Sequence, residues 1–292
     1  MSGCTTVAIF PTEAGETIRY VLDHSEASVL FVGKLDTWPL QAPFVPTNIP
    51  CIAFPLAPQN SFTKWDDIVK QTAPLQGDIS RAPTDLAMIM YTSGSTGQPK
   101  GVMHNFERIS AATNGIVKTL IETMGDRDDG RILSYLPLAH VFERAWVGAS
   151  SLVHGKTHVY FAESLDTFIQ DLNRARPTMF ISVPRLWLKF QQGVFSKMPP
   201  AKLNVLLSIP LLGGLVRKKI LKGLGLDQVI VAGSGSAPIP AELITWYRKL
   251  GLNLLEGYAM TEDFAYSHNS TNEVNAPGCV GCLLYTSPSP RD

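Results

Sequence analysis

The sequence has no excess of charge of either sign. Its 292 residues include 25 Lys and Arg against 25 Asp and Glu, so the formal net charge is zero. Proteins that bind nucleic acid rely on basic side chains that meet phosphates, and no nucleic-acid partner is therefore expected. Glycine and proline are close to the globular average, which excludes collagen-like and disordered chains. A chain of this length is long enough to bury a sizeable core.

Cysteine is scarce, with four residues in the whole chain. Four are too few for a disulfide framework, which favours a reducing compartment. Cys279 and Cys282 form a C-x-x-C pair, but a metal or redox site would need a second pair or a thioredoxin-like context. The N-terminal MSGCTTVAIF has no basic region before an apolar stretch, so it predicts no signal peptide, and we expect a cytoplasmic protein.

No apolar run is long enough to predict a transmembrane helix. Residues 203–216 are uncharged, but a spanning helix needs about 20 residues, and Pro210 interrupts this run. The next positions, 217–222, are rich in Arg and Lys. Two interpretations stay open: a peripheral helix on the anionic inner face of a membrane, or an ordinary buried or partly exposed pair of helices.

Short apolar segments rich in β-branched residues alternate with segments of helical period, and most of the former are apolar on both faces. The predicted strands are residues 6–10, 28–32, 86–91, 131–136, 157–161, 178–182 and 228–232. The predicted helices are residues 13–24, 105–124, 139–153, 165–175 and 241–250. This pattern is typical of an α/β fold in which helices flank largely parallel β-sheets. Residues 35–61 contain six prolines, and we interpret them as a surface loop.

The most informative segment is residues 86–101, LAMIMYTSGSTGQPKG, in which an apolar strand leads into a turn rich in glycine and hydroxyl groups. Glycines let the backbone turn back and present N–H groups to an anion. Hydroxyl groups and one ammonium group add donors for phosphate oxygens. The residues predicted to bind phosphate are Thr92, Ser93, Gly94, Ser95, Thr96, Gly97 and Lys100.

Other motifs for phosphate binding and catalysis do not fit. A Walker A motif needs Gly-Lys-Ser/Thr at the start of a helix, whereas Gln98 and Pro99 separate Gly97 from Lys100. The chain has no G-x-G-x-x-G and no G-x-S-x-G sequence, which disfavours a Rossmann site and a serine hydrolase. A flexible Gly/Ser turn is the remaining alternative, although such turns rarely follow a buried strand.

The segment TSGSTGQPKG, residues 92–101, resembles the phosphate-loop signature of the AMP-forming adenylating enzymes, which include acyl-CoA synthetases, luciferases and adenylation domains. LPLAHVFER, residues 136–144, is similar to the motif that follows it in the long-chain fatty-acyl members. The resemblance implies that His140 binds the substrate beside the acyl group and the phosphates. Without the resemblance, His140 also fits a structural histidine that is hydrogen-bonded at the start of a helix. A metal site shared by His140 and Glu143 would lack a third ligand.

Two later segments, VAGSGSAPIP at 231–240 and LLEGYAMTE at 254–262, resemble the nucleotide-binding strands and loops of the family. The residues that the resemblance places at the adenine are Ser236, Ala237, Pro238 and Tyr258. It also implies that Thr261 meets the phosphate and that Glu262 holds Mg²⁺, a cation that prefers hard oxygen ligands. Ser236 and Ala259 stand where many relatives have glycine. Without the resemblance, Glu262 would be a solvated loop acid and Tyr258 a core aromatic residue.

The resemblance implies a long-chain fatty acid:CoA ligase that uses ATP and Mg²⁺ to form an acyl adenylate and then acylates CoA. Its catalytic residues would be Lys100, Thr261 and Glu262. Residues 1–281 would be an incomplete large N-terminal domain, and we expect them to be inactive alone. The ribose-binding Asp, most of the CoA site and the small C-terminal domain with its lysine have no counterpart in this sequence. Residues 282–292, CLLYTSPSPRD, resemble a translated sequencing adapter and are predicted to be non-native.

Three other functions stay open. The first is another adenylating ligase, for medium-chain, aryl or amino acids, and the second is a nucleotide-binding module without turnover. The third is a P-loop NTPase, which the spacing around Pro99 disfavours. LPLAHVFER favours long-chain acids, because a bulky apolar chain needs a tunnel such as one lined by residues 145–153. The sequence does not determine acyl chain length or oligomeric state.

Overall fold

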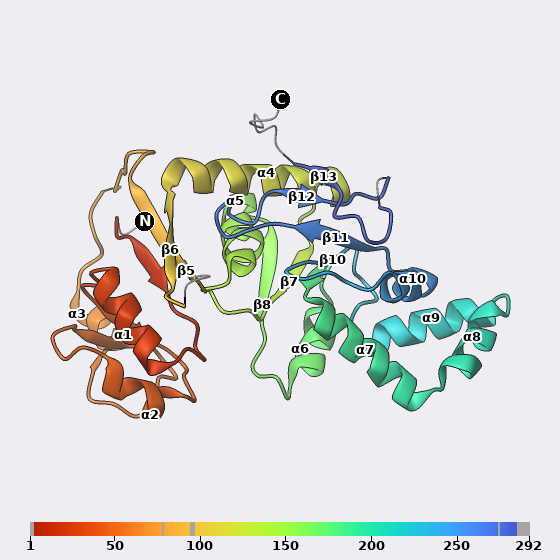
Figure 1. Cartoon of the computed structure of the whole chain (residues 1–292), viewed down its shortest axis with the longest axis horizontal. Helices are drawn as coiled ribbons and strands as arrows, with labels where there is room; N and C mark the ends of the chain where they lie inside the picture. The colour runs from red at the N-terminus through yellow and green to blue at the C-terminus, as the bar shows by residue number, and fades with distance from the viewer. Residues whose placement is uncertain (1–2, 78, 94–96, 274, 285–292) are drawn as a thin grey trace. The chain divides into compact units, whose positions relative to one another are not determined.

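The computed structural model describes residues 3–77, 79–93, 97–273 and 275–284. They divide into two compact units. Unit 1 comprises Met1–Ile109 and Pro137–Val141, and unit 2 comprises Ser110–Leu136 and Phe142–Asp292. Strands and helices alternate along most of the chain, and most of the paired strands run parallel (Figure 1). The α/β class predicted from the sequence is confirmed.

Unit 1 contains two small sheets. In the first, β5 (Leu86–Thr92) pairs in parallel with β1 (Thr6–Ala8) and antiparallel with β6 (Lys100–Asn105). The second sheet is parallel and consists of β2 (Leu30–Val32), β3 (Cys51–Ala53) and β4 (Thr63–Lys64). The helical elements are α1 (Gly15–His24), α2 (Trp38–Gln41), the 3-10 turn η1 (Ala42–Phe44) and α3 (Trp65–Gln71).

Residues 35–61, predicted to be a surface loop, contain α2, η1 and β3, so that prediction is wrong. The side chain of Gln41 is buried, and its Nε2 donates to the carbonyl oxygens of Pro11 at 2.8 Å and Glu13 at 3.0 Å. Proline stands in the first turn of both α2 and η1. A proline there removes no helical hydrogen bond, so these prolines start helical turns instead of excluding them.

Unit 2 is built around a parallel sheet. β10 (Val231–Ser234) pairs in parallel with β9 (Met179–Ser182) and with β11 (Leu254–Tyr258). The short strand β12 (His268–Asn269) pairs antiparallel with β11, and β13 (Cys282–Leu283) pairs antiparallel with β12. β7 (Gly130–Ser134) pairs in parallel with β8 (Thr157–Phe161). The helices are α4 (Phe106–Met124, which begins in unit 1), the π-helix η2 (Glu143–Ala149), α5 (Ser150–His154), α6 (Phe168–Ala175), α7 (Pro184–Lys197), α8 (Pro200–Ser208), α9 (Leu212–Gly223) and α10 (Ala241–Lys249).

Aromatic side chains form the centre of the core of unit 2. Trp187 on α7 and Tyr247 on α10 are both fully buried, and their rings meet edge to face with centroids 4.8 Å apart. Trp187 Nε1 donates to the carbonyl oxygen of Gly233 at 3.0 Å, and the Tyr247 hydroxyl donates to the carbonyl oxygen of Trp187 at 2.7 Å. Burial raises the pKa of Tyr247, which keeps its hydroxyl neutral and able to donate. The first bond ties α7 to β10 and the second ties α10 to α7, so both buried side-chain donors are paired.

One further predicted strand is confirmed, and one predicted helix differs from the structure. The strand predicted at 157–161 is present as β8 with the same bounds, and Phe161 at its end is 77% exposed. The helix predicted over 139–153 begins at Val141 and is a π-helix over Glu143–Ala149. The apolar period of a sequence cannot distinguish such a π-segment from an α-helix.

The chain around residue 281 packs closely against β12. Gly281 has φ of +86°, and a Cβ at this position would lie 2.1 Å from the carbonyl oxygen of Asn269. Cys282 and Leu283, the first residues of the predicted non-native tail, pair with Asn269 and His268. Residues 285–292 of that tail lie outside the described residues, and the boundary at 281/282 stays a prediction.

Among the residues that the structure describes, every helix is too short or too polar to cross a membrane. The uncharged stretch at 203–216 belongs to two helices, α8 and α9, and Pro210 lies between them.

Substitution of Gly225, which follows α9, tests how closely the chain packs against α6 at this point. Gly225 has φ of +73°, and a Cβ here would lie 2.7 Å from the carbonyl carbon of Leu172. Gly225→Ala is expected to destabilise the protein by about 2–4 kcal/mol, because both the backbone conformation and the packing oppose a side chain. The measurement is the free energy of unfolding in urea.

Gly251 supplies the matched control. Its φ is +91°, but a Cβ there would meet nothing within 4 Å. Gly251→Ala should therefore cost only the backbone strain, about 1 kcal/mol. If both variants lose the same free energy of unfolding, the contact between Gly225 and α6 is not close enough to exclude a side chain.

Candidate functional site

The turn predicted to bind phosphate connects two paired strands of unit 1. Thr92 ends β5, Lys100 begins β6, and the two residues are direct cross-strand partners. Ser93, Gly97 and Lys100 are exposed, and Gly97 has φ of +88°, a conformation that favours glycine. Gly94, Ser95 and Thr96 lie outside the described residues. The strand and the reversal of the chain are as predicted, while phosphate binding stays a prediction.

Close packing holds the base of this turn in place. A Cβ at Gly101 would lie 2.8 Å from Cγ2 of Ile89, so a larger residue at 101 would push the two strands apart. The hydroxyl of Tyr91 lies 2.8 Å from Nδ1 of His24, which links β5 to α1. Burial raises the pKa of Tyr91, and its hydroxyl stays protonated at neutral pH. The exposed turn thus rises from a fixed hairpin.

His140 lies in a tight turn of unit 1. Its N–H donates to the carbonyl oxygen of Pro137 at 2.8 Å, and its side chain is half-buried. Burial lowers the pKa of His140, so the imidazole is neutral at pH 7. A neutral imidazole has one donor and one acceptor nitrogen, which suits a residue that orients a substrate.

Glu143 is a buried carboxylate of unit 2 whose role the sequence did not reveal. It is 1% exposed, and its Oε1 accepts a hydrogen bond from Ser134 Oγ at 2.5 Å. Its Oε2 accepts one from the N–H of Leu136 at 3.3 Å. Burial raises the pKa of Glu143, and these hydrogen bonds oppose the rise. Glu143 therefore fixes the chain that leaves β7, and among the described residues no cluster of three His, Cys, Asp or Glu could hold a metal ion.

The adenine and metal residues of the prediction lie at one edge of the unit 2 sheet. Because β9, β10 and β11 are parallel, their carboxyl ends meet at the same edge. The loop with Ser236, Ala237 and Pro238 follows β10, and Tyr258 ends β11. Thr261 and Glu262 lie in the turn that follows β11, three and four residues after its end. Ligands of parallel α/β sheets bind at this edge, so the structure brings these residues together where a ligand is expected.

The side chains at this edge are available to a ligand. Tyr258 is 47% exposed, and its ring meets that of His268 edge to face at 5.9 Å, so it is not a core residue. Glu262 is exposed and Thr261 is half-buried. An exposed ring offers a stacking face, and an exposed carboxylate offers oxygen ligands.

Ser236 adopts an unfavourable backbone conformation. Its φ is +68°, in the left-handed region where only glycine is relaxed. The neighbouring Gly235 runs close to β11, since a Cβ there would lie 3.5 Å from the carbonyl oxygen of Gly257. This conformation gives a physical reason for the glycine that the family resemblance expected at 236.

Asp263 is a second residue whose role the sequence did not reveal. Its Oδ1 accepts a hydrogen bond from the N–H of Met260 at 3.0 Å, and burial raises the pKa of its carboxyl group. The bond closes the turn that carries Thr261 and Glu262. An Asp that bonds the backbone three residues earlier is typical of turns, and this was the available signal.

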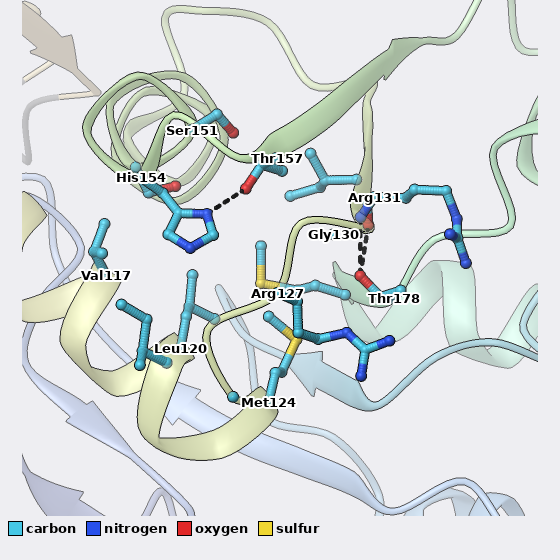
Figure 2. A pocket seen from close by; sticks show the side chains of 15 residues that line it. Val117, Leu120, Met124, Arg127, Gly130, Arg131, Ser151, His154, Thr157 and Thr178 are labelled. Atoms are coloured by element: carbon cyan, nitrogen blue, oxygen red, sulfur yellow. Dashed lines mark hydrogen bonds between the residues drawn. The ribbon is translucent and has the colours of Figure 1, made fainter.

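A small cavity in unit 2 lies away from this edge (Figure 2). It lies between α4, α5 and the amino ends of β7, β8 and β9, and includes Leu120, Met124 and His154. In the lining of this cavity, His154 Nδ1 lies 3.1 Å from Thr157 Oγ1, which is within hydrogen-bonding distance. Its volume of about 30 Å³ is room for little more than a water molecule. It is therefore not a site for a large ligand.

The comparison with protein families agrees with the motifs. The model of the AMP-binding enzyme family matches residues 1–287. The chain belongs to the AMP-binding enzyme family. The match extends into the segment predicted to be non-native, and the origin of that segment stays a prediction.

Curated relatives and a solved structure show similar proteins. Long chain acyl-CoA synthetase 4 of Arabidopsis thaliana is 28% identical over 320 residues, covering 96% of this chain and 47% of the relative. Long-chain-fatty-acid–CoA ligase 1 of Homo sapiens is 29% identical over 293 residues, covering 88% of this chain and 41% of the relative. The chain thus spans about half the length of these proteins.

The crystal structure of the anthranilate CoA ligase AuaEII in complex with anthranoyl-AMP matches with a TM-score of 0.73 and 18% identity. The match covers 96% of this chain and 50% of that chain. The fold is that of the N-terminal domain of adenylate-forming enzymes, as the motifs implied.

The buried Glu143 predicts a specific dependence of stability on pH. A carboxyl group whose pKa is raised by folding binds its proton more tightly in the folded state, so stability falls as pH rises through the raised pKa. Relative to Glu143→Gln, the wild-type protein should lose stability above the ordinary pKa of glutamate, about 4.3. The measurement is the difference in free energy of unfolding between the two proteins from pH 4 to pH 8.

Ser134→Ala sharpens this test. It removes a hydrogen bond that favours the charged carboxylate, so the loss of stability with rising pH should become larger. A difference between wild type and Glu143→Gln that stays constant over the pH range would show that burial does not perturb Glu143.

The strain at Ser236 predicts that glycine is better there. Ser236→Gly should stabilise the protein by about 0.5–1 kcal/mol, because relief of the left-handed strain exceeds the added entropy of the unfolded chain. Ser236→Ala keeps the strain and should give no gain. The readout is the urea midpoint of each variant, and a loss of stability in Ser236→Gly would contradict the conformation of this loop.

Proposed function

We propose that the protein containing this chain is an AMP-forming long-chain fatty acid:CoA ligase. One observation carries the proposal: two curated relatives matched over at least 88% of this chain are named as a long-chain acyl-CoA synthetase and a long-chain fatty acid–CoA ligase. The motif at residues 136–144 points the same way. Another acid-adenylating ligase, for aryl acids for example, is the second candidate, because AuaEII shares the fold.

The reaction needs electrostatic help because it brings two anions together. The carboxylate of the acid attacks the α-phosphate of ATP, and pyrophosphate leaves. The thiol of CoA then attacks the acyl carbon of the acyl adenylate, the acyl–phosphate bond breaks, and AMP leaves. The residues must therefore neutralise phosphate charge and align the attacking oxygen. CoA is proposed as the acyl acceptor, with most of its site outside these 292 residues.

In unit 1, the proposal assigns phosphate binding to the hairpin turn. The hydroxyl groups of Thr92 and Ser93, the backbone at Gly97 and the ammonium group of Lys100 would bind phosphate oxygens, together with Gly94, Ser95 and Thr96. Lys100 is exposed and stands opposite Thr92, so both can present donors from the same end of the hairpin. His140, neutral at pH 7, would orient the acid without adding charge.

In unit 2, the proposal assigns the adenine to the loop at 236–238 and to the exposed ring of Tyr258. Thr261 would bind a phosphate oxygen, and Glu262 would hold Mg²⁺. The donors fit this ion, because Mg²⁺ typically takes one or two protein carboxylates and completes its shell with water and phosphate oxygens. A single exposed carboxylate beside a hydroxyl group meets that need without a cluster of acids. When bound, Mg²⁺ supplies charge neutralisation at the phosphates.

We further propose that these 292 residues bind nucleotide but do not form acyl adenylate on their own. The resemblance assigns the lysine that meets the α-phosphate to a part of the family sequence without a counterpart here. A peripheral location on a membrane is a separate proposal, which is argued below from the surface of unit 2.

Binding of MgATP to the chain, measured by titration calorimetry, tests the nucleotide site. Lys100→Gln should weaken binding by roughly tenfold to a hundredfold, because a hydrogen bond to a charged group is worth about 1.5–3 kcal/mol. Lys64→Gln, a change of another exposed lysine in unit 1, should leave binding unchanged. Absence of MgATP binding to folded wild-type protein would overturn the proposal.

The substrate class can be tested without turnover. Non-hydrolysable acyl-sulfamoyl adenosines combine the acid and the adenylate, and the palmitoyl compound should bind more tightly than the octanoyl and benzoyl compounds. Tighter binding of the benzoyl compound would favour an aryl-acid ligase. Hydrolysis of ATP in the absence of any acid would favour an NTPase, and acid-dependent exchange of pyrophosphate into ATP would contradict the predicted inactivity.

A further inference from the structure

Acidic residues are absent from a long part of unit 2. No Asp or Glu occurs between Asp171 and Asp227, although the whole chain has 25 acidic and 25 basic residues. Helices α7, α8 and α9 all lie in this part of the sequence. Their exposed basic residues are Arg185, Lys189, Lys197, Lys202, Arg217, Lys218, Lys219 and Lys222. None of these forms an ion pair within the described part of the chain, so their charge is not neutralised locally.

The same region exposes a group of aliphatic side chains where α8 turns into α9. We call this group the α8–α9 tip; it consists of Val205, Ile209, Leu211, Leu212 and Leu215. Leu211 is 91% exposed and Leu215 is 67% exposed. Figure 1 shows α8 and α9 side by side, with the connection between them at one end of the pair. Residues three or four apart on a helix share a face, so the tip is continuous with the first turn of α9.

The tip is firmly attached to the rest of unit 2. Leu203 is fully buried in the core, and Val216 and Ile220 pack against that core from the other face of α9. A Cβ at Gly213 would lie 2.5 Å from the carbonyl oxygen of Leu207, so the two helices approach closely where they join. The exposed aliphatic side chains are therefore held on a fixed support, next to the basic residues of α9.

We propose that the α8–α9 tip and the basic residues around it dock on the surface of an anionic lipid membrane. The tip would enter the boundary between headgroups and acyl chains, and the basic side chains of α8 and α9 would bind lipid phosphates. A helix pair with an aliphatic end, many cations and no acid has the composition of a membrane-surface element.

Two features favour a lipid surface over a protein partner. Protein interfaces are rich in exposed aromatic residues, whereas the tip is wholly aliphatic, and Trp187 and Phe190 of α7 are buried. A second copy of this chain would bring the same basic surface against itself, and such like charges repel. An anionic membrane supplies both a negative surface and an apolar interior. The proposal concerns this surface only and does not depend on the ligase activity.

Vesicle binding by the folded chain is the test. Co-sedimentation is measured with vesicles of phosphatidylcholine alone and of phosphatidylcholine with one quarter phosphatidylglycerol. The protein should bind the anionic vesicles and be released as salt is raised, because screening weakens the attraction. Circular dichroism is the check that each variant is folded before its binding is compared.

Two sets of variants separate the two parts of the surface. Lys218→Gln, Lys219→Gln and Lys222→Gln together should weaken binding roughly a hundredfold, since each basic residue contributes about fivefold. Leu211→Gly with Leu215→Gln should weaken it by at least about tenfold. Leu211 has φ of +63°, so glycine relieves strain there and the fold should not suffer.

Matched controls change exposed residues of the same kinds elsewhere. The apolar control is Leu165→Gly with Leu75→Gln, at side chains 91% and 72% exposed. The basic control is Lys64→Gln, Lys70→Gln and Lys249→Gln, at exposed lysines. Both controls should bind as the wild type does. The proposal is overturned by absent binding, by equal binding to neutral vesicles, by equal losses in the controls, or by a dimer that Leu211→Gly with Leu215→Gln dissociates.

Discussion

Parallel pairing of β10 with β9 and β11 is the constraint on which unit 2 depends. It brings the ends of three strands, separated in sequence by long helical segments, to one edge. The centre of the sheet tolerates little change: a Cβ at Gly233 would lie 2.9 Å from Ile181 Cγ1, and the carbonyl oxygen of Gly233 accepts the bond from Trp187. The edge is different, because its loops end in exposed groups such as Tyr258. Rigidity inside and access at the edge are what a ligand site needs.

The turn after β11 shows how that edge is held in shape. Phe264 and Ala265 both have positive φ, of 54° and 57°, although neither is glycine. The ring of Phe264 is 1% exposed, and the carbonyl oxygen of Ala265 accepts a hydrogen bond from Trp146 Nε1 at 2.8 Å. Burial and this bond offset the backbone strain, which persists only where the surroundings enforce it. Thr261 and Glu262 are thus carried by a turn with little freedom.

Much of the fold could be predicted because its elements have local signals. The apolar strand before Thr92 and the glycines after it predicted both β5 and the reversal into β6. The strand predicted at 228–232 begins three residues later, at Val231, because the N–H groups of Ile230 and Val231 both donate to the carbonyl oxygen of Thr178. That interruption is set by a residue distant in sequence, so no local pattern reveals it. Strands of two residues, such as β12, have too little pattern to be predicted.

The candidate site divides in the same way. Residues with distinctive chemistry in a fixed motif were found from the sequence, and the structure places Ser236, Tyr258 and Glu262 at one sheet edge. Glu143 and Asp263 were missed, because an acid in a helix or a turn usually faces water. The Glu143 side chain holds the chain that leaves β7, and the Asp263 side chain holds the turn that follows β11. Both carboxyl groups bond the backbone. Sequence motifs indicate groups that bind a ligand, so they do not reveal such residues.

Net charge was the least informative property of the sequence. Its total is zero, although basic residues are concentrated in a segment between Asp171 and Asp227 that contains no acidic residue. Electrostatic repulsion lowers the stability of the fold where Lys218, Lys219 and Lys222 lie together without acidic neighbours. Acidic residues among them would remove this repulsion. The field of such a group decays within about 10 Å at ordinary salt, so it affects only a surface that comes into near contact. The neighbouring α8–α9 tip is aliphatic, so it favours contact with a surface that has an apolar interior below a charged outer layer. The two features complement the same kind of surface, although each alone would have an ordinary explanation.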